Sequence, residues 1–312
     1  MDCVVTLLPT GELVTTEPRK VTRGTKVALG AAEDGSEGIF VHTEGFLAGR
    51  HSANEFRFMQ TEVSRERPVD YAVLAQLLGE ETEQGGKIVW VIGPALVHAR
   101  AREDMVWFIE RGYVGALLGG NAVAVHDLEA AIFGTSLGVS SSGEEVAGGH
   151  SLHMRAINAI RRAGSITAAV ERGVVTGGIM HALVMHKVPY VLAGSIRDDG
   201  PLPEVLSDSL AAQDAMRAIT VQATFAVFVA TALHAIAVGN MLPAFVDAAT
   251  PDGVRPLTTI CVDQTEFVVN KLRDRGTHQA YGVVTNAQDF MHVLRFYVER
   301  WEQARTPASL AR

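Results

Sequence analysis

The sequence predicts an α/β protein, with an open, mostly parallel sheet covered by helices on both faces and a small β-rich domain before it. Three observations predict this class. Short strand-like runs separated by close turns fill residues 1 to about 45. From Lys87 onward, apolar runs alternate with helical segments. These later runs are continuously apolar, which is typical of parallel strands buried on both faces.

The N-terminal domain is predicted to span residues 1–84. Its strand-like runs are bounded by Gly, Pro or charged residues and are Val4–Leu8, Leu13–Thr16, Lys26–Leu29 and Gly38–Val41. A helix with 3.6-residue spacing follows over 69–78, and Pro68 stands where a first helical turn tolerates it. We place the domain boundary in the polar connector Gly79–Gly86.

The second domain is predicted to span residues 85–312. Its expected strands are Ile88–Ile92, Val114–Leu118, Tyr190–Ala193, Thr259–Asp263 and Gly282–Thr285. Helices are expected over 99–111, 122–133, 151–163, 207–238 and 266–274. The most apolar stretch, Ala223–Val238, is shorter than a membrane-spanning helix requires and is interpreted as a buried core helix.

Composition excludes several classes of function. The chain has 312 residues, a formal net charge of -8 and 47% hydrophobic residues. A mildly acidic chain lacks the basic patch of a nucleic-acid binder, and nothing indicates a membrane surface as partner. The two cysteines, Cys3 and Cys261, are too few for a disulfide framework and fit a reducing cytoplasm, and the N-terminus has no signal-peptide pattern.

Ligands of open α/β sheets bind beyond the carboxyl ends of the strands. Five polar or glycine-containing strand exits are therefore expected to form one cleft: Gly93–Ala95, Gly119–Ala122, Ser195–Gly200, Val262–Asp263 and Thr285–Ala287. A G-x-G-x-x-G fingerprint is absent from the chain. Gly119-Gly120-Asn121 is the candidate phosphate cradle, and a plain turn with Asn121 as helix cap is the alternative. Asp263 suits ribose hydroxyls or, alternatively, a helix cap.

Two further segments carry candidate catalytic groups. Arg197 suits bidentate binding of a carboxylate, and Asp198 or Asp199 suits an ammonium group; a structural salt-bridge loop is the alternative. His150 and His153 lie in a glycine-rich loop as candidate acid or base, although surface histidines at a helix start explain them equally well. A metal site would need a third ligand, so no metal is expected.

Two mechanisms are disfavoured. None of the five lysines lies in a glycine-rich strand exit, which argues against a lysine nucleophile. Ser195 stands in Ala-Gly-Ser-Ile and not in a G-x-S-x-G elbow, which argues against a serine hydrolase.

Several segments together resemble one family. They include GGKIVWVIGPALVH, GYVGALLGGNAVAVHDLEAAIFGTSLGV, GGHSLHMRAINAIRRAGSI, VPYVLAGSIRDDGPLPEV, LHAIAVGNMLP, ICVD and VVTNAQDF. The chain resembles the ornithine cyclodeaminases of archaea, which also form the C-terminal part of cyanobacterial arginine dihydrolase–ornithine cyclodeaminase proteins. The region is also known as a domain associated with lysine-ketoglutarate reductase and saccharopine dehydrogenase. The Rossmann-like part also resembles deoxyhypusine synthase, which binds NAD without a G-x-G-x-x-G, although the catalytic lysine of that enzyme has no counterpart here.

The resemblance implies an NAD-dependent conversion of L-ornithine to L-proline and ammonia, in which NAD takes a hydride from ornithine and later returns it. The alternatives are an amino-acid or imino-acid dehydrogenase that exchanges its cofactor, and an NAD-binding regulatory module without turnover. Strand-end position and resemblance together give the expected NAD-binding residues, which are Asn121, Ala122, Asp199, His234, Gly239, Asn240, Met241, Leu242, Asp263, Asn286 and Ala287.

The chain departs from the family pattern in three places, which are Met180-His181-Ala182, an insertion over Ala248–Pro256, and Asn286 where Asp is expected. The expected partner is a small amino-acid substrate. A symmetric homodimer or homotetramer is expected as well, because Phe225, Phe228, Leu233 and Ile236 are interpreted as one long apolar helix.

Overall fold

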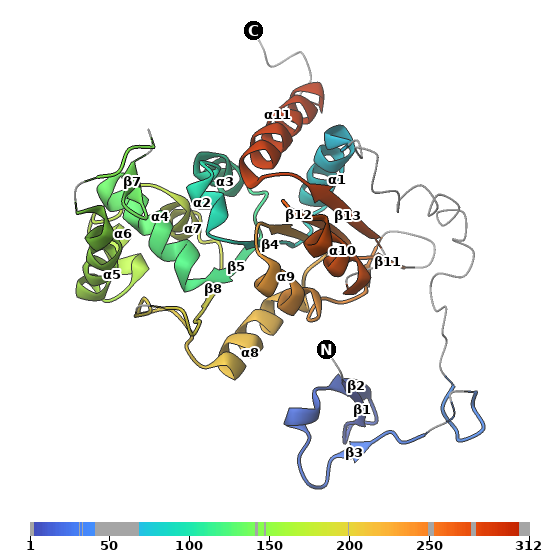
Figure 1. Cartoon of the computed structure of the whole chain (residues 1–312). Helices are drawn as coiled ribbons and strands as arrows, with labels where there is room; N and C mark the ends of the chain where they lie inside the picture. The colour runs from blue at the N-terminus through green and yellow to red at the C-terminus, as the bar shows by residue number, and fades with distance from the viewer. Residues whose placement is uncertain are drawn as a thin grey trace. The chain divides into compact units, whose positions relative to one another are not determined.

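The computed structural model describes residues 3–30, 32, 34–40, 69–140, 143–146, 148–198, 200–248, 253–275 and 279–305, without the side chains of 150, 272–275 and 279. The chain divides into two compact units, Met1–Arg67 and Pro68–Arg312 (Figure 1). Residues 41–68 lie outside the described residues.

The N-terminal unit contains a three-stranded antiparallel sheet, which confirms its predicted β-rich character. Its elements are β1 (Val4–Leu7), β2 (Leu13–Thr16), the 3-10 helix η1 (Pro18–Lys20) and β3 (Lys26–Val27), with strand order β2-β1-β3. Buried Thr6 shares a 2.7 Å hydrogen bond with Thr16 across the first pair. The run expected over Gly38–Val41 forms only an isolated bridge between Phe40 and Asp34 in its described part.

The second unit is built on six parallel strands in the order β13-β12-β9-β4-β5-β8. Their bounds are β4 (Ile88–Ile92), β5 (Ala116–Gly120), β8 (Tyr190–Ala193), β9 (Phe225–Val229), β12 (Thr258–Asp263) and β13 (Gln279–Val284). Every neighbouring pair in this sheet is parallel, so all six carboxyl ends lie at one edge. The predicted α/β class is confirmed.

Helices cover both faces of the sheet (Figure 1). One face packs against α1 (Tyr71–Glu83), α3 (Arg102–Glu110), α4 (Asn121–Phe133), α7 (Ile179–Met185) and α11 (Ala287–Arg305). The other packs against α8 (Ser209–Thr220) and α9 (Ala232–Gly239), with α10 (Glu266–Arg275) beside them. The remaining elements are α2 (Ala95–His98), α5 (Leu152–Ala163), α6 (Ile166–Glu171), η5 (Gly149–Ser151), β6 (Thr135–Ser136), β7 (Val139–Ser140), β10 (Phe245–Asp247) and β11 (Val254–Pro256).

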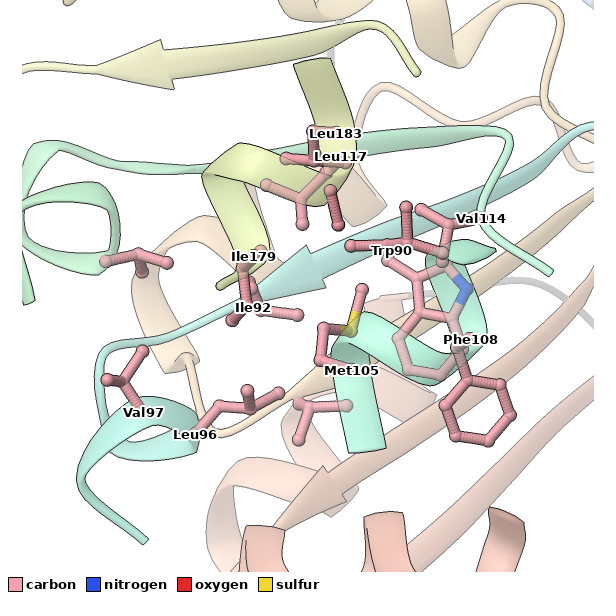
Figure 2. Packing of buried hydrophobic residues seen from close by; sticks show 14 of the residues in the cluster. Trp90, Ile92, Leu96, Val97, Met105, Phe108, Val114, Leu117, Ile179 and Leu183 are labelled. Carbon is pink, nitrogen blue, oxygen red and sulfur yellow. The ribbon is translucent and has the colours of Figure 1, made fainter. Parts of the chain in front are cut away.

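Strand β4 shows why its apolar run is continuous. Trp90 faces the first core, where Figure 2 shows it among Met105, Phe108 and Val114, while Val89 and Val91 face the second core. The indole N–H of Trp90 donates to the carbonyl oxygen of Tyr113 at 2.9 Å, so its buried polar atom is satisfied. A strand buried on both faces leaves no position for a polar side chain.

The boundary between the two units lies after Arg67 and not in the Gly79–Gly86 connector. Helix α1 belongs to the second unit because it packs along α11, with Leu74 and Leu78 buried in the same core as Phe290. Its polar connector is simply the turn that leads into β4.

The expected single helix over 207–238 is wrong. The segment contains α8, then the central strand β9, then α9. The interpretation of Ala223–Val238 as a core helix fails because Phe225–Val229 is the strand between β4 and β12, and Ala230, with φ 54°, ends it. Aromatic and β-branched residues favour a strand here, and a short apolar run does not distinguish strand from helix by periodicity.

Helices α6, α7 and α11 were not predicted from the sequence. The insertion Ala248–Pro256 contributes β11 of a small antiparallel hairpin with β10, apart from residues 249–252, which lie outside the described residues. Within the part of the chain that the structure describes, no helix combines the length and apolarity needed to cross a membrane.

Candidate functional site

The three central strands lead almost at once into helices at the carboxyl edge of the sheet. Strand β4 leads through Gly93-Pro94 into α2, β5 leads directly into α4, and β9 leads through Ala230-Thr231 into α9 (Figure 1). These strands are neighbours in the sheet, so the three helix starts lie next to one another. The β9 exit was missed in the sequence because its strand was interpreted as a helix.

The N-termini of these three helices have no capping side chain. Among the other described helices, Asp70 caps α1, Ser165 caps α6 and Asp208 caps α8, whereas the N-cap residues of α3 and α5 make no such bond. An uncapped helix start offers free backbone N–H groups and the positive end of the helix dipole. The centre of the carboxyl edge is therefore suited to an anion such as a pyrophosphate.

Two glycines, Gly93 and Gly120, allow neighbouring strand exits to pack closely at this edge. The amide of Gly93 donates to the carbonyl oxygen of Val229 at 2.9 Å, and a Cβ at Gly93 would collide with the carbonyl oxygen of Ala230. A Cβ at Gly120 would lie 2.8 Å from Cε1 of His234. Glycine at 120 thus lets the imidazole of His234 lie against the β5 exit.

The turn after β8 is folded on its own side chains. The carboxylate of Asp198 accepts a hydrogen bond from the amide of Ser195 at 2.7 Å, and the hydroxyl of Ser195 accepts from the amide of Arg197 at 3.1 Å. Arg197 is exposed, and no residue that the structure describes forms an ion pair with it. Asp199 lies outside the described residues. The turn therefore presents a free guanidinium beside a partly buried carboxylate.

His234 lies between this turn and the β5 exit. Burial lowers the pKa of its imidazole below the ordinary value of 6.5, and the negative charge of Asp198 acts in the opposite direction. The ring is therefore neutral at pH 7 and able to accept a proton. The sequence assigned His234 to the cofactor, and the structure adds Asp198 as its charged neighbour.

Asn121 has a structural contact that its sequence position does not reveal. Gly120, not Asn121, is the N-cap of α4, and the Asn121 side chain is 4% exposed. Its amide oxygen accepts a hydrogen bond from the amide of Leu202 at 3.1 Å. Asn121 therefore ties the start of α4 to the segment that follows the charged turn, with Ala122 in the first turn of the helix.

Asp263 and Asn286 lie at the exits of β12 and β13 and shape local turns. One carboxylate oxygen of Asp263 accepts from both the amide and the hydroxyl of Thr265 at 3.0 Å. Asn286 caps α11 by accepting from the amide of Asp289 at 2.8 Å, and Ala287 begins that helix as a buried residue. These contacts leave the second oxygen of Asp263 for a ligand.

The predicted residues Gly239, Asn240, Met241 and Leu242 lie at the opposite end of α9 from His234. An eight-residue helix is about 12 Å long, so these residues are a helix length from the strand exits. Met241 is buried in the second core, and its carbonyl oxygen accepts from the hydroxyl of Thr220 at 3.4 Å. The role of these four residues in NAD binding stays a prediction.

The two histidines of the glycine-rich segment lie at the start of the α5 region. His150 is in η5, and its side chain is not described. His153 is on α5, and its Nδ1 lies 3.7 Å from Oε2 of Glu129 on α4. No contact among the described residues joins His153 to Arg197 or Asp198. His153 instead lies beside His126, with ring centroids 5.0 Å apart.

Asp127 is a further buried group of α4. Its carboxylate is fully buried and accepts from Nε of Arg102 at 2.6 Å and from the amides of Ile179 and Met180 at 2.9 and 2.8 Å. It therefore caps α7 and neutralises Arg102. Asp127 is a structural residue, and its neighbour His126 faces α5 instead.

A family model for the C-terminal Rossmann fold of ArgZ-like arginine dihydrolases matches residues 72–294. The chain is 46% identical over 296 residues to an ornithine cyclodeaminase of Methanopyrus kandleri, covering 93% of this chain and 67% of that protein. It is 42% identical over 283 residues to the bifunctional arginine dihydrolase/ornithine cyclodeaminase ArgZ of Synechocystis, covering 89% of this chain and 38% of that one.

Solved structures give the same pattern. A conserved putative LOR/SDH protein of Methanococcus maripaludis matches with a TM-score of 0.78 at 35% identity, covering 97% of this chain and 85% of that one. The ternary complex of AgrE with ornithine and NAD+ matches with a TM-score of 0.71 at 35% identity, covering 97% and 41%. The chain thus spans most of these archaeal relatives and less than half of the bifunctional ones.

Proposed function

The chain belongs to the ornithine cyclodeaminase family, and from that premise we propose that it converts L-ornithine to L-proline and ammonia with bound NAD. The observation that supports this most directly is the adjacency of an anion-binding edge and a charged turn. Three uncapped helix starts lie beside Arg197, Asp198 and His234. A dinucleotide and a zwitterionic diamine need these two kinds of group.

The residues at the edge fit NAD. Gly120 and the first turn of α4 would hold the pyrophosphate through backbone N–H groups, although the chain has no G-x-G-x-x-G. The free oxygen of Asp263 would accept from ribose hydroxyls at one end of the edge. Bound NAD supplies a hydride acceptor that becomes the donor later in the same turnover, so no external reductant is consumed.

The charged turn would hold the substrate. The guanidinium of Arg197 suits the α-carboxylate because it donates two parallel hydrogen bonds. Asp198, and Asp199 beside it in the sequence, suit an ammonium group of ornithine. Fixing both ends orients the α-carbon toward the nicotinamide side of the edge.

His234 is the acid–base group that the geometry favours over His150 and His153. Its neutral imidazole lies near Asp198 and against Gly120, between the substrate groups and the cofactor edge. It would take the proton that the α-amine loses as the hydride departs, and Asp198 would stabilise the resulting imidazolium. We place this chemistry in the cytoplasm, where amino acids and NAD are available.

The decisive assay is purified protein with ornithine and NAD far below the substrate concentration. We expect proline and ammonia in equal amounts over many turnovers, with no accumulation of NADH. Steady NADH accumulation would instead indicate a dehydrogenase. NAD binding without any product would indicate a regulatory module, and either result overturns the proposal.

Asp263→Asn should weaken NAD binding by about 10- to 150-fold, which corresponds to the roughly 1.5–3 kcal/mol of a hydrogen bond to a charged group. Asparagine keeps an oxygen for Thr265, so the turn is retained and the charge is lost. Calorimetric titration with NAD measures the change. Asp34→Asn, in the N-terminal unit, is the matched control, because one oxygen of Asp34 likewise accepts from the amide and the hydroxyl of a residue two positions on, Ser36. Equal affinity in both variants would refute the ribose contact.

The chain should form a homodimer or homotetramer through the edge that holds the site. Ile196, Leu233 and Phe267 are each 71% or more exposed, and each lies three or four residues after the carboxyl end of a strand. Large exposed apolar side chains grouped at one edge mark an interaction surface. The prediction of an oligomer now rests on these three residues. Phe225 and Phe228, on which it was first based, are buried in β9.

Light scattering at working concentration should give twice or four times the chain mass. The double variant Leu233→Glu with Phe267→Glu should lower that mass. Leu210→Glu, at a 53% exposed position on α8, should leave it unchanged. A wild-type protein with the mass of one chain would contradict the expectation.

A further inference from the structure

Helices α4 and α5 bring three metal-ligand side chains together outside the site described above. His126 and Glu129 lie three residues apart on one face of α4, and His153 comes from the first turn of α5. Their ligand atoms all lie within 4.8 Å of one another. His126 is 6% exposed and Glu129 is fully buried.

Glu129 is held in a fixed orientation. Its Oε1 accepts from the hydroxyl of Thr135 and the amide of Gly138, both at 2.9 Å. Its Oε2 accepts from the amide of Leu137 at 3.2 Å and faces both imidazoles. A carboxylate oriented by neighbouring groups in this way is typical of metal ligands.

The two imidazoles face Glu129 without forming hydrogen bonds to it. Nδ1 of His126 lies 3.9 Å from Oε2 of Glu129, and Nδ1 of His153 lies 3.7 Å from it. Both Nδ1 atoms are buried and have no hydrogen-bond partner among the described residues. These distances are too long for hydrogen bonds, and leaving a buried polar atom unpaired costs about 1–3 kcal/mol. A cation bound by both Nδ1 atoms and by Oε2 of Glu129 would satisfy these buried atoms.

We propose that His126, Glu129 and His153 bind a divalent transition-metal ion, with zinc as the best fit. Two ligands bonded to zinc at about 2.0–2.2 Å in tetrahedral geometry lie about 3.4 Å apart, close to the separations found here. Two imidazoles with one carboxylate are a known zinc and iron donor set.

His98 lies at the rim of this group. Its ring is 4.4 Å from that of His126, and its Nδ1 shares a 2.8 Å hydrogen bond with the hydroxyl of Ser136. The fourth position of a tetrahedral site would then be taken by water or by Nε2 of His98. Because the ligands come from two helices, the ion would fasten α5 to α4. This proposal does not depend on the proposed reaction.

The experiment uses the whole chain, freed of any histidine tag and stripped with a chelator. Titration with zinc chloride should give one tightly bound ion per chain, and cobalt chloride should give the visible absorption of a four-coordinate site. Bound zinc should raise the melting temperature, since it binds the folded state. Failure of the wild-type chain to bind zinc or cobalt at micromolar concentration would overturn the proposal, whatever the variants do.

The variants locate the ion. His153→Ala and Glu129→Gln should each weaken zinc binding by about 100-fold or more and abolish the cobalt spectrum. His292→Ala is the matched control, because Nδ1 of His292 also lies 3.7 Å from a carboxylate, that of Asp104, but on a side chain 77% exposed. It should bind zinc as the wild type does. Unchanged binding in both His153→Ala and Glu129→Gln would show that the ion lies elsewhere.

Discussion

Arg197→Lys should lower kcat/KM for ornithine by about 100-fold while leaving the fold intact. A lysine keeps the positive charge but cannot donate two parallel hydrogen bonds to a carboxylate, and hydrogen bonds to charged groups contribute about 1.5–3 kcal/mol. The fold should survive because Arg197 is exposed and the turn is held by Ser195 and Asp198. Steady-state kinetics with ornithine and the melting temperature measure the two effects.

The control for this change is Arg172→Lys, which alters an exposed arginine at the end of α6. Near-normal turnover in Arg197→Lys would mean that the charged turn is structural. The carboxylate anchor would then be sought elsewhere, beginning with Arg155, whose guanidinium lies over the ring of Phe133. Neither variant should accumulate NADH, since both substitutions leave the residues proposed to hold NAD in place.

Local sequence patterns predicted most strands of the sheet. The one large error, at β9, shows the limit of such patterns. The sheet strands Ile88–Ile92 and Tyr190–Ala193 have the bounds expected from their apolar runs. The run Phe225–Val229 has the same character, but it is followed by another apolar segment, Ala232–Gly239. Only Ala230 and Thr231 separate the two, and the left-handed conformation of Ala230 has no sequence signal.

Candidate site residues at strand ends could be predicted from the sequence. Contacts that depend on the packing of distant segments could not. Parallel strands fix which exits meet, so Gly120, Arg197 and Asp263 could be grouped from the sequence. The contact of Asn121 with Leu202 spans 81 residues, and that of His153 with Glu129 requires α5 to lie along α4. Such contacts leave no periodic pattern, so Glu129 had no signal beyond its spacing from His126.

Residues Gly239–Leu242 show that residues close in sequence can lie far from one another in the fold. Expected strand-end position and the family resemblance, through the matching string LHAIAVGNMLP, put these residues in the cofactor set together with His234. Residues five to eight positions apart on a short helix lie near its two ends. Gly239–Leu242 are therefore separated from His234 along the axis of α9. Their role in NAD binding remains a prediction, and the structure gives His234 the place at the strand exits.

His234→Gln should lower kcat by about 10²- to 10⁴-fold, the usual range for loss of a general acid–base group. Glutamine keeps most of the size and one hydrogen-bonding group of histidine, so the packing against Gly120 should survive. NAD affinity should change little, because the cofactor edge consists mainly of backbone groups. A parallel fall of kcat and NAD affinity would instead indicate a cofactor-binding role.

The pH profile separates the proton-accepting role of His234 from a purely structural one. Burial lowers the pKa of His234 below 6.5, so kcat/KM should be at its plateau at pH 7 and fall only as the pH drops through that lowered pKa. The charge of Asp198 raises this pKa. Asp198→Asn keeps an oxygen for the amide of Ser195 but removes the charge, so it should shift the acid limb to lower pH. The limb should vanish in His234→Gln; an acid limb at the same pH in all three proteins would assign the titrating group to another residue, because neither substitution would then have touched it.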